Sequence, residues 1–190
     1  MSASLRRVHY TYADYLALEE ESSVRHEFLD GEIYAMAGGS PDHAALAAAL
    51  IRLVGNRLPP SGRTFTSDLR VRIAATGLTT YPDAAVVCGR TQRSPDDPLA
   101  VTNPVLLIEV TSSSTEEYDR GEKLRHYTSL PSVREVLIAS HRGPELTLHR
   151  REDAGWTVVT AGPGDVVELV SVAARIPVDE VYREGLEDAG

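Results

Sequence analysis

Two carboxylates stand in otherwise apolar strand sequences. Asp83 lies within residues 80–88, and Glu109 lies within residues 105–111, Val-Leu-Leu-Ile-Glu-Val-Thr. Taking a carboxylate out of water is costly unless it is paired or bound to a cation. Carboxylate oxygens are the ligands that Mg²⁺ and Mn²⁺ prefer. Either acid alone is better explained by a strand end that faces water, but the two together, with a cation nearby, favour a metal site.

A single lysine follows these acids. Lys123 is the only lysine among the 19 lysine and arginine residues. Because the chain uses arginine elsewhere, retention of a lysine indicates a need for a compact, mobile charge. Chance retention on a solvated helix is the competing interpretation. Asp119–Lys123 and Glu116–Arg120 have the i,i+4 spacing of surface ion pairs, which would contribute only tenths of a kcal/mol.

The lysine lies on a predicted helix over residues 116–129. At ~100° per residue, Lys123 falls at the border of the packed face, beside Tyr127. Arg120 falls between Tyr127 and Leu124 and is predicted to point inward. Neither cation is therefore expected on the fully exposed face of the helix.

Three elements precede the acids and add further polar candidates. A helix is predicted over residues 10–21, and a β-hairpin with an Asp-Gly turn follows it, with Glu27 on the first strand. A second helix is predicted over residues 40–58, with Ser-Pro at its start and His43 in its first turn. A histidine in that place is more often a capping or surface residue than a ligand.

The two strands that carry the acids are predicted to be central in a sheet. Both are apolar on both faces, which is typical of burial between layers. A polar loop over residues 89–102 joins them. A further strand over residues 134–140 follows the helix, so the strand–helix–strand order predicts a parallel crossover. Other strands are expected over residues 63–75, 145–152, 156–160 and 166–172, and a last helix over residues 178–183.

Length and composition indicate one globular domain. The 190 residues, 42% apolar and 25% charged, predict a single domain over residues 1–190 with a core over about residues 24–151. No apolar run approaches the roughly 20 residues of a membrane span. The single cysteine, Cys88, excludes an intrachain disulfide and a multi-cysteine zinc site. The first seven residues lack the apolar segment of a signal peptide, so a cytoplasmic location is expected.

The net charge of −9 argues against a general nucleic-acid coat protein, because proteins that neutralise phosphates usually carry basic patches. This charge does not exclude an enzyme that meets DNA in a local groove.

The order of elements and motifs resembles the PD-(D/E)xK nuclease superfamily. More closely, the motifs look like the Uma-type family, a large bacterial group of proposed restriction endonucleases. The similarity covers roughly residues 10 to 150, and Asp-Arg-Gly-Glu-Lys-Leu is its most specific part. The motifs that carry it are Phe-Leu-Asp-Gly-Glu-Ile, Ser-Pro-Asp-His, Tyr-Pro-Asp, Ile-Glu-Val-Thr-Ser-Ser-Ser-Thr and Tyr-Asp-Arg-Gly-Glu-Lys-Leu-Arg-His-Tyr.

The resemblance implies an α/β fold with a restriction-endonuclease-like core. This is a mixed central β-sheet flanked by helices, here with an N-terminal helix and β-hairpin. It implies a metal-dependent endonuclease that hydrolyses nucleic-acid phosphodiester bonds. Asp83 and Glu109 would bind Mg²⁺ or Mn²⁺, and Lys123 would position the attacking hydroxide or stabilise the transition state.

The resemblance also implies accessory residues and partners. Glu27 and His43 are candidates to complete the site, and Arg120 to hold a phosphate or one of the acids. The superfamily's lysine normally lies two residues after the second acid, where this chain has Thr111, so Lys123 would have to supply the ammonium from the helix. The expected partner is nucleic acid, DNA first, with no membrane. A homodimer is expected because cutting a duplex needs two sites.

Two other readings compete with the enzyme. A non-catalytic nucleic-acid-binding or protein-interaction module on a nuclease scaffold is favoured slightly by the acidic charge and by Thr111. A small-molecule hydrolase lacks a nucleophile motif, since no Gly-x-Ser-x-Gly is present and Cys88 has no evident base. Carboxylates of Asp83 and Glu109 on opposite faces of the sheet would exclude the enzyme.

Overall fold

The central sheet of the computed structural model, which describes residues 9–186, contains both acid-bearing strands. The strand order of this mixed sheet is β12-β11-β10-β9-β6-β3. β6 and β9 pair antiparallel, and β9 and β10 pair parallel, as the strand–helix–strand order predicted. Residues 1–7, from which the sequence predicted no signal peptide, lie outside the described residues. The strands are β3 (Gly62–Thr66), β6 (Ala84–Cys88), β9 (Leu106–Val110), β10 (Glu135–Ala139), β11 (Leu146–Glu152) and β12 (Gly155–Ala161).

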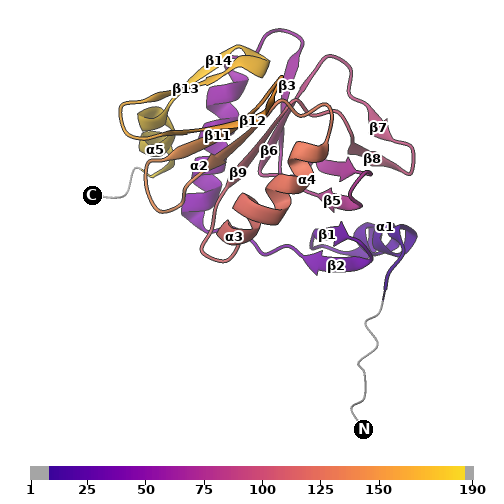
Figure 1. Ribbon diagram of the computed structural model, residues 1–190. Coiled ribbons are helices and arrows are strands. Elements are labelled where there is room, and N and C mark those ends of the chain that lie inside the picture. The colour runs from indigo at the N-terminus through magenta and orange to yellow at the C-terminus, as the bar shows by residue number, and fades with distance from the viewer. Residues whose placement is uncertain (1–8, 187–190) are drawn as a thin grey trace.

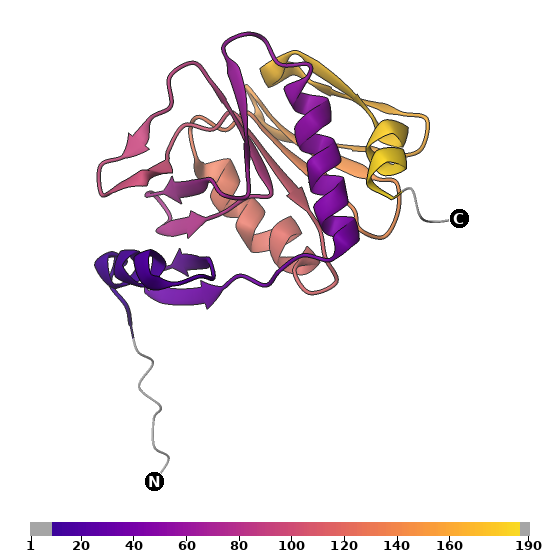
Figure 2. The same ribbon diagram turned by 180° about the vertical axis from the view of Figure 1, so that it is seen from behind.

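Helices cover both faces of the central sheet. Figure 1 shows α4 in front of β9 and β6, and Figure 2 shows α2 and α5 on the opposite face. The elements on the α4 face are α3 (Glu116–Tyr118), the π-helical turn η1 (Asp119–Lys123) and α4 (Leu124–Ser129). Those on the other face are α2 (Pro41–Gly55), β13 (Val166–Leu169), the 3-10 turn η2 (Val170–Val172), β14 (Ala174–Pro177) and α5 (Val178–Gly185).

A second sheet lies beside the α4 face. Its strand order is β2-β1-β5-β4-β8-β7, and α1 (Tyr12–Glu21) packs on it through the fully buried Tyr15. Figure 1 shows α1 and the hairpin β1-β2 together at the edge of the fold. The strands are β1 (His26–Leu29), β2 (Glu32–Ala35), β4 (Arg70–Ile73), β5 (Leu78–Thr80), β7 (Arg93–Ser94) and β8 (Asp97–Val101).

Two apolar cores follow from strand alternation in the central sheet. Successive residues of β9 face opposite sides, so Leu106 and Ile108 pack under α2, whereas Leu107 packs under α4 and the second sheet. The helix α2 begins with Ser40, whose hydroxyl accepts a hydrogen bond from the His43 N–H (3.2 Å). This cap fixes the first turn of α2 against the end of the central strands.

A buried polar network joins α1 to the segment before Asp83. The Arg70 guanidinium donates to the Tyr81 hydroxyl (2.7 Å), to Asp97 (2.8 Å) and to Glu19 (3.2 Å). The Tyr81 hydroxyl also donates to Glu19. All of these side chains are largely buried, so each charge depends on its partners.

Several predicted bounds are wrong. The strand predicted over residues 80–88 is two strands, because Tyr81-Pro82-Asp83 leaves the ladder, and a proline has no N–H to donate to one. The helix over residues 116–129 is interrupted by the π-helical turn, and the helix over residues 40–58 ends at Gly55. The polar loop over residues 89–102 contains β7 and β8, and β14 was not predicted. The antiparallel meander over residues 145–160 is confirmed by β11 and β12.

Within the described ranges, no helix is both long and apolar enough to cross a bilayer.

Candidate active site

Asp83 and Glu109 are neighbours at one end of the β6–β9 pair. Ala84 pairs with Ile108, so Asp83, the residue just before β6, lies beside Glu109, the residue after Ile108 on β9. Oδ2 of Asp83 accepts a hydrogen bond from the backbone N–H of Val110 (2.7 Å), which holds the carboxylate against β9.

Lys123 connects the helix to this pair. Its Nζ lies 3.0 Å from Oε1 of Glu109, 3.3 Å from Oε1 of Glu27 and 3.8 Å from Oδ1 of Asp119. The lysine side chain is only 6% exposed, so it belongs to the packed face rather than to its border. One buried ammonium therefore serves three carboxylates, and none of the three can be treated as a surface ion pair.

The burial of these groups changes their titration. Burial raises the pKa of Glu109 to about 8, although Lys123 acts to lower it. Burial also raises the pKa of Asp119. Burial alone would lower the pKa of the Lys123 ammonium, but Glu109, Tyr127 and Glu27 hold it well above its usual value. Lys123 therefore keeps its charge at neutral pH.

Glu27 and Glu109 are held by hydroxyl groups as well. Tyr127, one helical turn after Lys123, donates its hydroxyl to Glu109. Thr80 donates to Oε1 of Glu27, and the Tyr118 hydroxyl donates to Oε2 of Glu27 (3.2 Å). Each carboxylate is thus fixed in orientation from at least two elements.

His43 contacts Asp83 from the first turn of α2. Its Nε2 lies 3.2 Å from Oδ2 of Asp83. The hydrogen bond to Asp83 raises the pKa of His43, and burial opposes this rise. The interpretation of His43 as a capping or surface residue is therefore wrong, because the ring faces the carboxylate end of the central strands.

Thr111 is bound where the superfamily places its lysine. This residue is fully buried, and its Oγ1 contacts Nδ1 of His141 (2.8 Å) and accepts from the His141 backbone N–H (3.0 Å). Its own N–H donates to Ala139 (2.9 Å). A lysine side chain has no place in this packed contact.

Arg120 points away from the acids of the site. It contacts Glu116 (3.4 Å), Glu145 (3.4 Å) and the Thr147 hydroxyl (3.1 Å). Its contact with the buried Thr147 of β11 agrees with the predicted inward position, off the fully exposed face of the helix. The expectation that Arg120 holds an acid of the site is not met by any of these contacts.

The free oxygens of the site suit a hard cation. Among the described residues, hydrogen bonds and ion pairs occupy Oδ2 of Asp83 and Oε1 of Glu109, and neither kind of contact is made by Asp83 Oδ1 or Glu109 Oε2. No group of three or more His, Cys, Asp or Glu residues in the described part is placed to hold a metal. Two carboxylates with retained water fit Mg²⁺ or Mn²⁺, which often use only one or two carboxylates, and do not fit a structural zinc site.

These groups line a concavity of about 600 Å³ that also takes in the Ser112–Thr115 link. A family model described as "Putative restriction endonuclease" matches residues 12–178 of the chain. The chain belongs to the Uma2 family. The predicted Uma-type resemblance is thereby confirmed, and the match extends beyond the stretch that carried the motifs.

Two cyanobacterial proteins are similar to the Uma2 chain over two thirds of its length or more. The uncharacterized protein slr1290 of Synechocystis sp. (strain ATCC 27184 / PCC 6803 / Kazusa) is 37% identical over 172 residues, which is 90% of each chain. The uncharacterized protein sll1609 of the same organism is 36% identical over 132 residues, 67% of this chain and 73% of that one.

A solved structure shows the fold. The crystal structure of a putative nuclease belonging to DUF820 from Anabaena variabilis ATCC 29413 superposes with a TM-score of 0.76 at 16% identity, covering 92% of this chain and 98% of that one. The predicted α/β fold with a restriction-endonuclease-like core is confirmed by this likeness.

Sequence reasoning missed three residues of the site. Asp119 was interpreted as half of a surface ion pair, yet it is buried, and its Oδ2 accepts from the Thr115 hydroxyl (2.6 Å). His141 follows β10 and had no signal of its own. Tyr118 was not singled out as a site residue. The 119–123–127 spacing was the available signal, because it puts an acid, a lysine and a tyrosine on one side of the helix.

Proposed function

We propose that this protein is a metal-dependent endonuclease that hydrolyses phosphodiester bonds of nucleic acid, with DNA as the first candidate. The observation that carries the proposal is the Lys123 ammonium, 3.0 Å from the Glu109 carboxylate, with Asp83 held against the same strand by the Val110 N–H (2.7 Å). The family description and the nuclease-like fold support it. We also propose that the whole chain forms one nuclease-like domain.

The proposed ligands are Asp83 and Glu109, and the proposed cation is Mg²⁺ or Mn²⁺. When bound, the cation would lower the pKa of water and neutralise charge on the scissile phosphate. The side chains of the site have separate proposed roles. Glu109 must release its proton to act as a ligand, and the adjacent Lys123 favours that release.

Lys123 is the proposed electrostatic group. Its ammonium is fixed by Glu109, Glu27 and Asp119, so its position costs little reorganisation when negative charge develops on the phosphate. Glu27 and His43 are proposed as positioning residues. Glu27 orients the lysine, and His43 orients Asp83 through the contact of 3.2 Å.

Calorimetric titration with Mg²⁺ and Mn²⁺, paired with cleavage of plasmid and single-stranded DNA, tests this function. Wild type should bind the cation and nick the plasmid, and Asp83→Ala should lose both. Asp153→Ala, which removes an exposed carboxylate in the β11–β12 turn, is the matched control and should behave as wild type. Cation binding unchanged in Asp83→Ala would refute the assigned ligands.

The same experiment separates the enzyme from a non-catalytic module on a nuclease scaffold. A module of that kind would bind nucleic acid or protein without cleavage in any divalent cation. A homodimer is proposed in addition, because two sites are needed to cut both strands of a duplex. Sedimentation of the chain with and without duplex DNA would test it, and a monomer in both states would reject it.

A further inference from the structure

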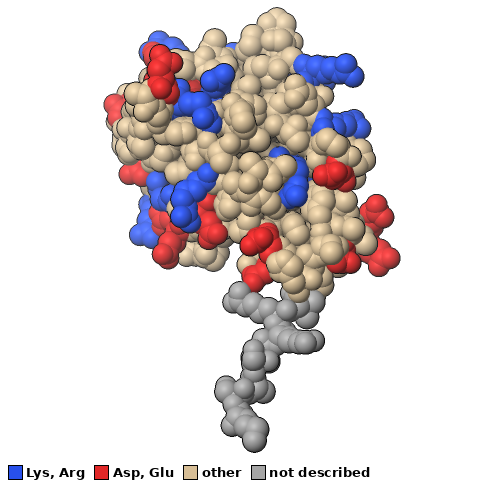
Figure 3. Space-filling model, turned by 45° about the vertical axis from the view of Figure 1, so that its right-hand side comes forward, with Lys and Arg blue, Asp and Glu red and all other residues tan. Residues whose placement is uncertain are grey.

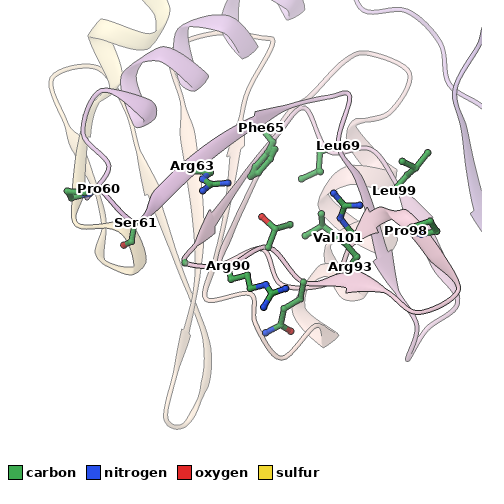
Figure 4. A pocket seen from close by; sticks show the side chains of 13 residues that line it. Pro60, Ser61, Arg63, Phe65, Leu69, Arg90, Arg93, Pro98, Leu99 and Val101 are labelled. Carbon is green, nitrogen blue, oxygen red and sulfur yellow. The ribbon is translucent and has the colours of Figure 1, made fainter.

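A second concavity lies at the other end of the β3–β6 pair. It has a volume of about 1270 Å³ and is lined by residues of β3, of the segment after β6, and of β8. Figure 4 shows Arg63, Arg90 and Arg93 around this hollow, with Phe65 and Leu69 on the same side of it as Arg63. We call this site the arginine groove and define it by these three arginines and Phe65.

The arginines of the groove are exposed and carry unbalanced charge. No carboxylate lines the groove, and in the described part of the chain none of its three guanidinium groups has an ion-pair partner. Two acids near the groove in sequence are engaged elsewhere, since Asp68 pairs with Arg25 and Asp97 is buried against Arg70. The exposed Asp96 follows Arg93 by three residues but does not line the groove. Three unpaired cations in one concavity are notable in a chain of net charge −9.

The candidate active site has the opposite balance. Four carboxylates gather there around the single lysine, so a phosphate chain meets a site that attracts it poorly before a cation is bound. Figure 3 shows acidic and basic groups interspersed over most of the visible side, with basic groups standing apart from acidic ones at its upper right edge. Attraction for a polyanion must therefore come from basic surface outside the catalytic pocket.

The sheet register places the groove on the face that carries Glu109. Phe65 pairs with Ala85, and Ala85 pairs with Leu107, so these side chains share a face. Glu109 is two residues beyond Leu107 and therefore points to the same face. Arg63 pairs with Val87, so at ~3.3 Å per residue this arginine stands roughly 13 Å from Asp83 along β6.

We propose that the arginine groove binds the sugar–phosphate backbone of the nucleic-acid substrate outside the catalytic pocket. The guanidinium groups would contact phosphates, and the partly exposed Phe65 ring would contact a sugar or an unpaired base. The inference rests on the proposed function for the identity of the polyanion, but it assigns the groove no part in bond cleavage.

Fluorescence anisotropy of labelled DNA measures the groove directly. The test variant is Arg63→Gln/Arg90→Gln/Arg93→Gln, and the control is Arg125→Gln/Arg134→Gln/Arg175→Gln. The control removes the same charge at exposed positions elsewhere. Binding is followed from 50 to 400 mM salt, in separate arms with duplex and single-stranded DNA, after chelation of divalent cations to prevent cleavage.

The groove variant should bind at least roughly tenfold more weakly at low salt than wild type. Its slope of log K against log salt should be smaller by about 2.7 for duplex or about 2 for single strands, as expected for three lost phosphate contacts. The control variant should keep the wild-type slope. Whichever arm shows the larger loss identifies the form of nucleic acid that the groove holds.

Equal affinity and equal slopes in the groove and control variants would overturn the inference. If the triple variant does not fold, the three single substitutions replace it, and each should lower the duplex slope by about 0.9. The results separate failure of the groove proposal from failure of the endonuclease proposal. Cleavage with unchanged binding in the groove variant rejects the groove alone, whereas groove-dependent binding without cleavage in any divalent cation rejects the enzyme alone.

Discussion

The Nζ atom of Lys123 lies 3.0 Å from Oε1 of Glu109, although the lysine comes from a helical turn and the glutamate from near the end of β9. Both side chains are almost completely buried, and the same lysine also contacts Glu27 and Asp119. The ion pair therefore fixes the helix over the sheet and sets the charge of the site at once.

Removal of Lys123 should destabilise the protein. Lys123→Met leaves buried carboxylates without their cation, and we expect a loss of about 3–5 kcal/mol in the free energy of unfolding. Urea denaturation measures it. Lys123→Arg keeps the charge and should lose clearly less. Mg²⁺ should restore more stability to Lys123→Met than to wild type, because the cation takes over part of the neutralisation. Equal stability of Lys123→Met and wild type would contradict this account.

The pH dependence of stability should report Glu109. In the folded protein its pKa is about 8, against an ordinary value of 4.5. Between these values the folded protein holds a proton that the unfolded chain has released. The contribution is therefore fully present below about pH 4.5 and is lost as the pH rises through about 8, by at most about 1.4 kcal/mol per pH unit. Urea denaturation of wild type and Glu109→Gln from pH 5 to 9 should show this slope in their difference.

The affinity for a divalent cation should rise with pH, whereas the contribution of Glu109 to stability falls. A carboxylate must be deprotonated to bind a cation, so binding to the protonated site releases a proton. Affinity for Mn²⁺ should rise by up to about tenfold per pH unit below pH 8 and level off above it. Calorimetry in buffers of different ionisation enthalpy counts the released proton. A pH-independent affinity between pH 6 and 8 would show that Glu109 is already charged or is not a ligand.

Thr111 should act as a packing and hydrogen-bonding residue. Thr111→Val removes the contacts with His141, and we expect a cost of about 1–3 kcal/mol in stability, with cation binding retained. Thr160→Val, at an exposed position of β12, is the control and should be near neutral. Thr111→Lys in the Lys123→Met background should not restore cleavage. Restored cleavage would show that the superfamily position remains usable.

The buried network of Glu19, Arg70 and Tyr81 should stabilise the segment that carries Asp83. Glu19→Gln weakens the buried contacts to Arg70 and Tyr81, and we expect a loss of about 3 kcal/mol in stability. Cation affinity should fall with it, because Tyr81 precedes Asp83 by only two residues. Glu20→Gln, an exposed neighbour on the same helix, should change stability by less than about 0.5 kcal/mol. If Glu19→Gln had the same free energy of unfolding as wild type, Glu19 would not stabilise this segment.

The local chemistry of the site was readable in the sequence. An isolated carboxylate in an apolar strand is expensive, so Asp83 and Glu109 could be singled out without a structure, and their placement on neighbouring strands is confirmed. The only lysine was singled out by composition alone. The two central strands and the parallel step from β9 to β10 followed from burial and element order.

What the sequence did not predict depended on long-range packing. His43 could be placed in the first turn of a helix, but its direction depends on how α2 crosses β6 and β9. Asp97 resembled a solvated loop acid because its partner, Arg70, lies far away in the chain. Arg120 was predicted to point inward, but its partners Glu145 and Thr147 lie 25 and 27 residues away in the chain, so the sequence could not show that it contacts them rather than the acids of the site.

The position of Glu19 bears on how the chain can be dissected. A fragment that begins at residue 24, where the predicted core starts, would keep Asp83, Glu109 and Lys123 but would lose α1. Arg70 and Tyr81 would then be left under the site without one of their partners. Deletion mapping with such fragments would report a missing support as a missing catalytic part, so an inactive fragment would carry no information about which residues do the chemistry.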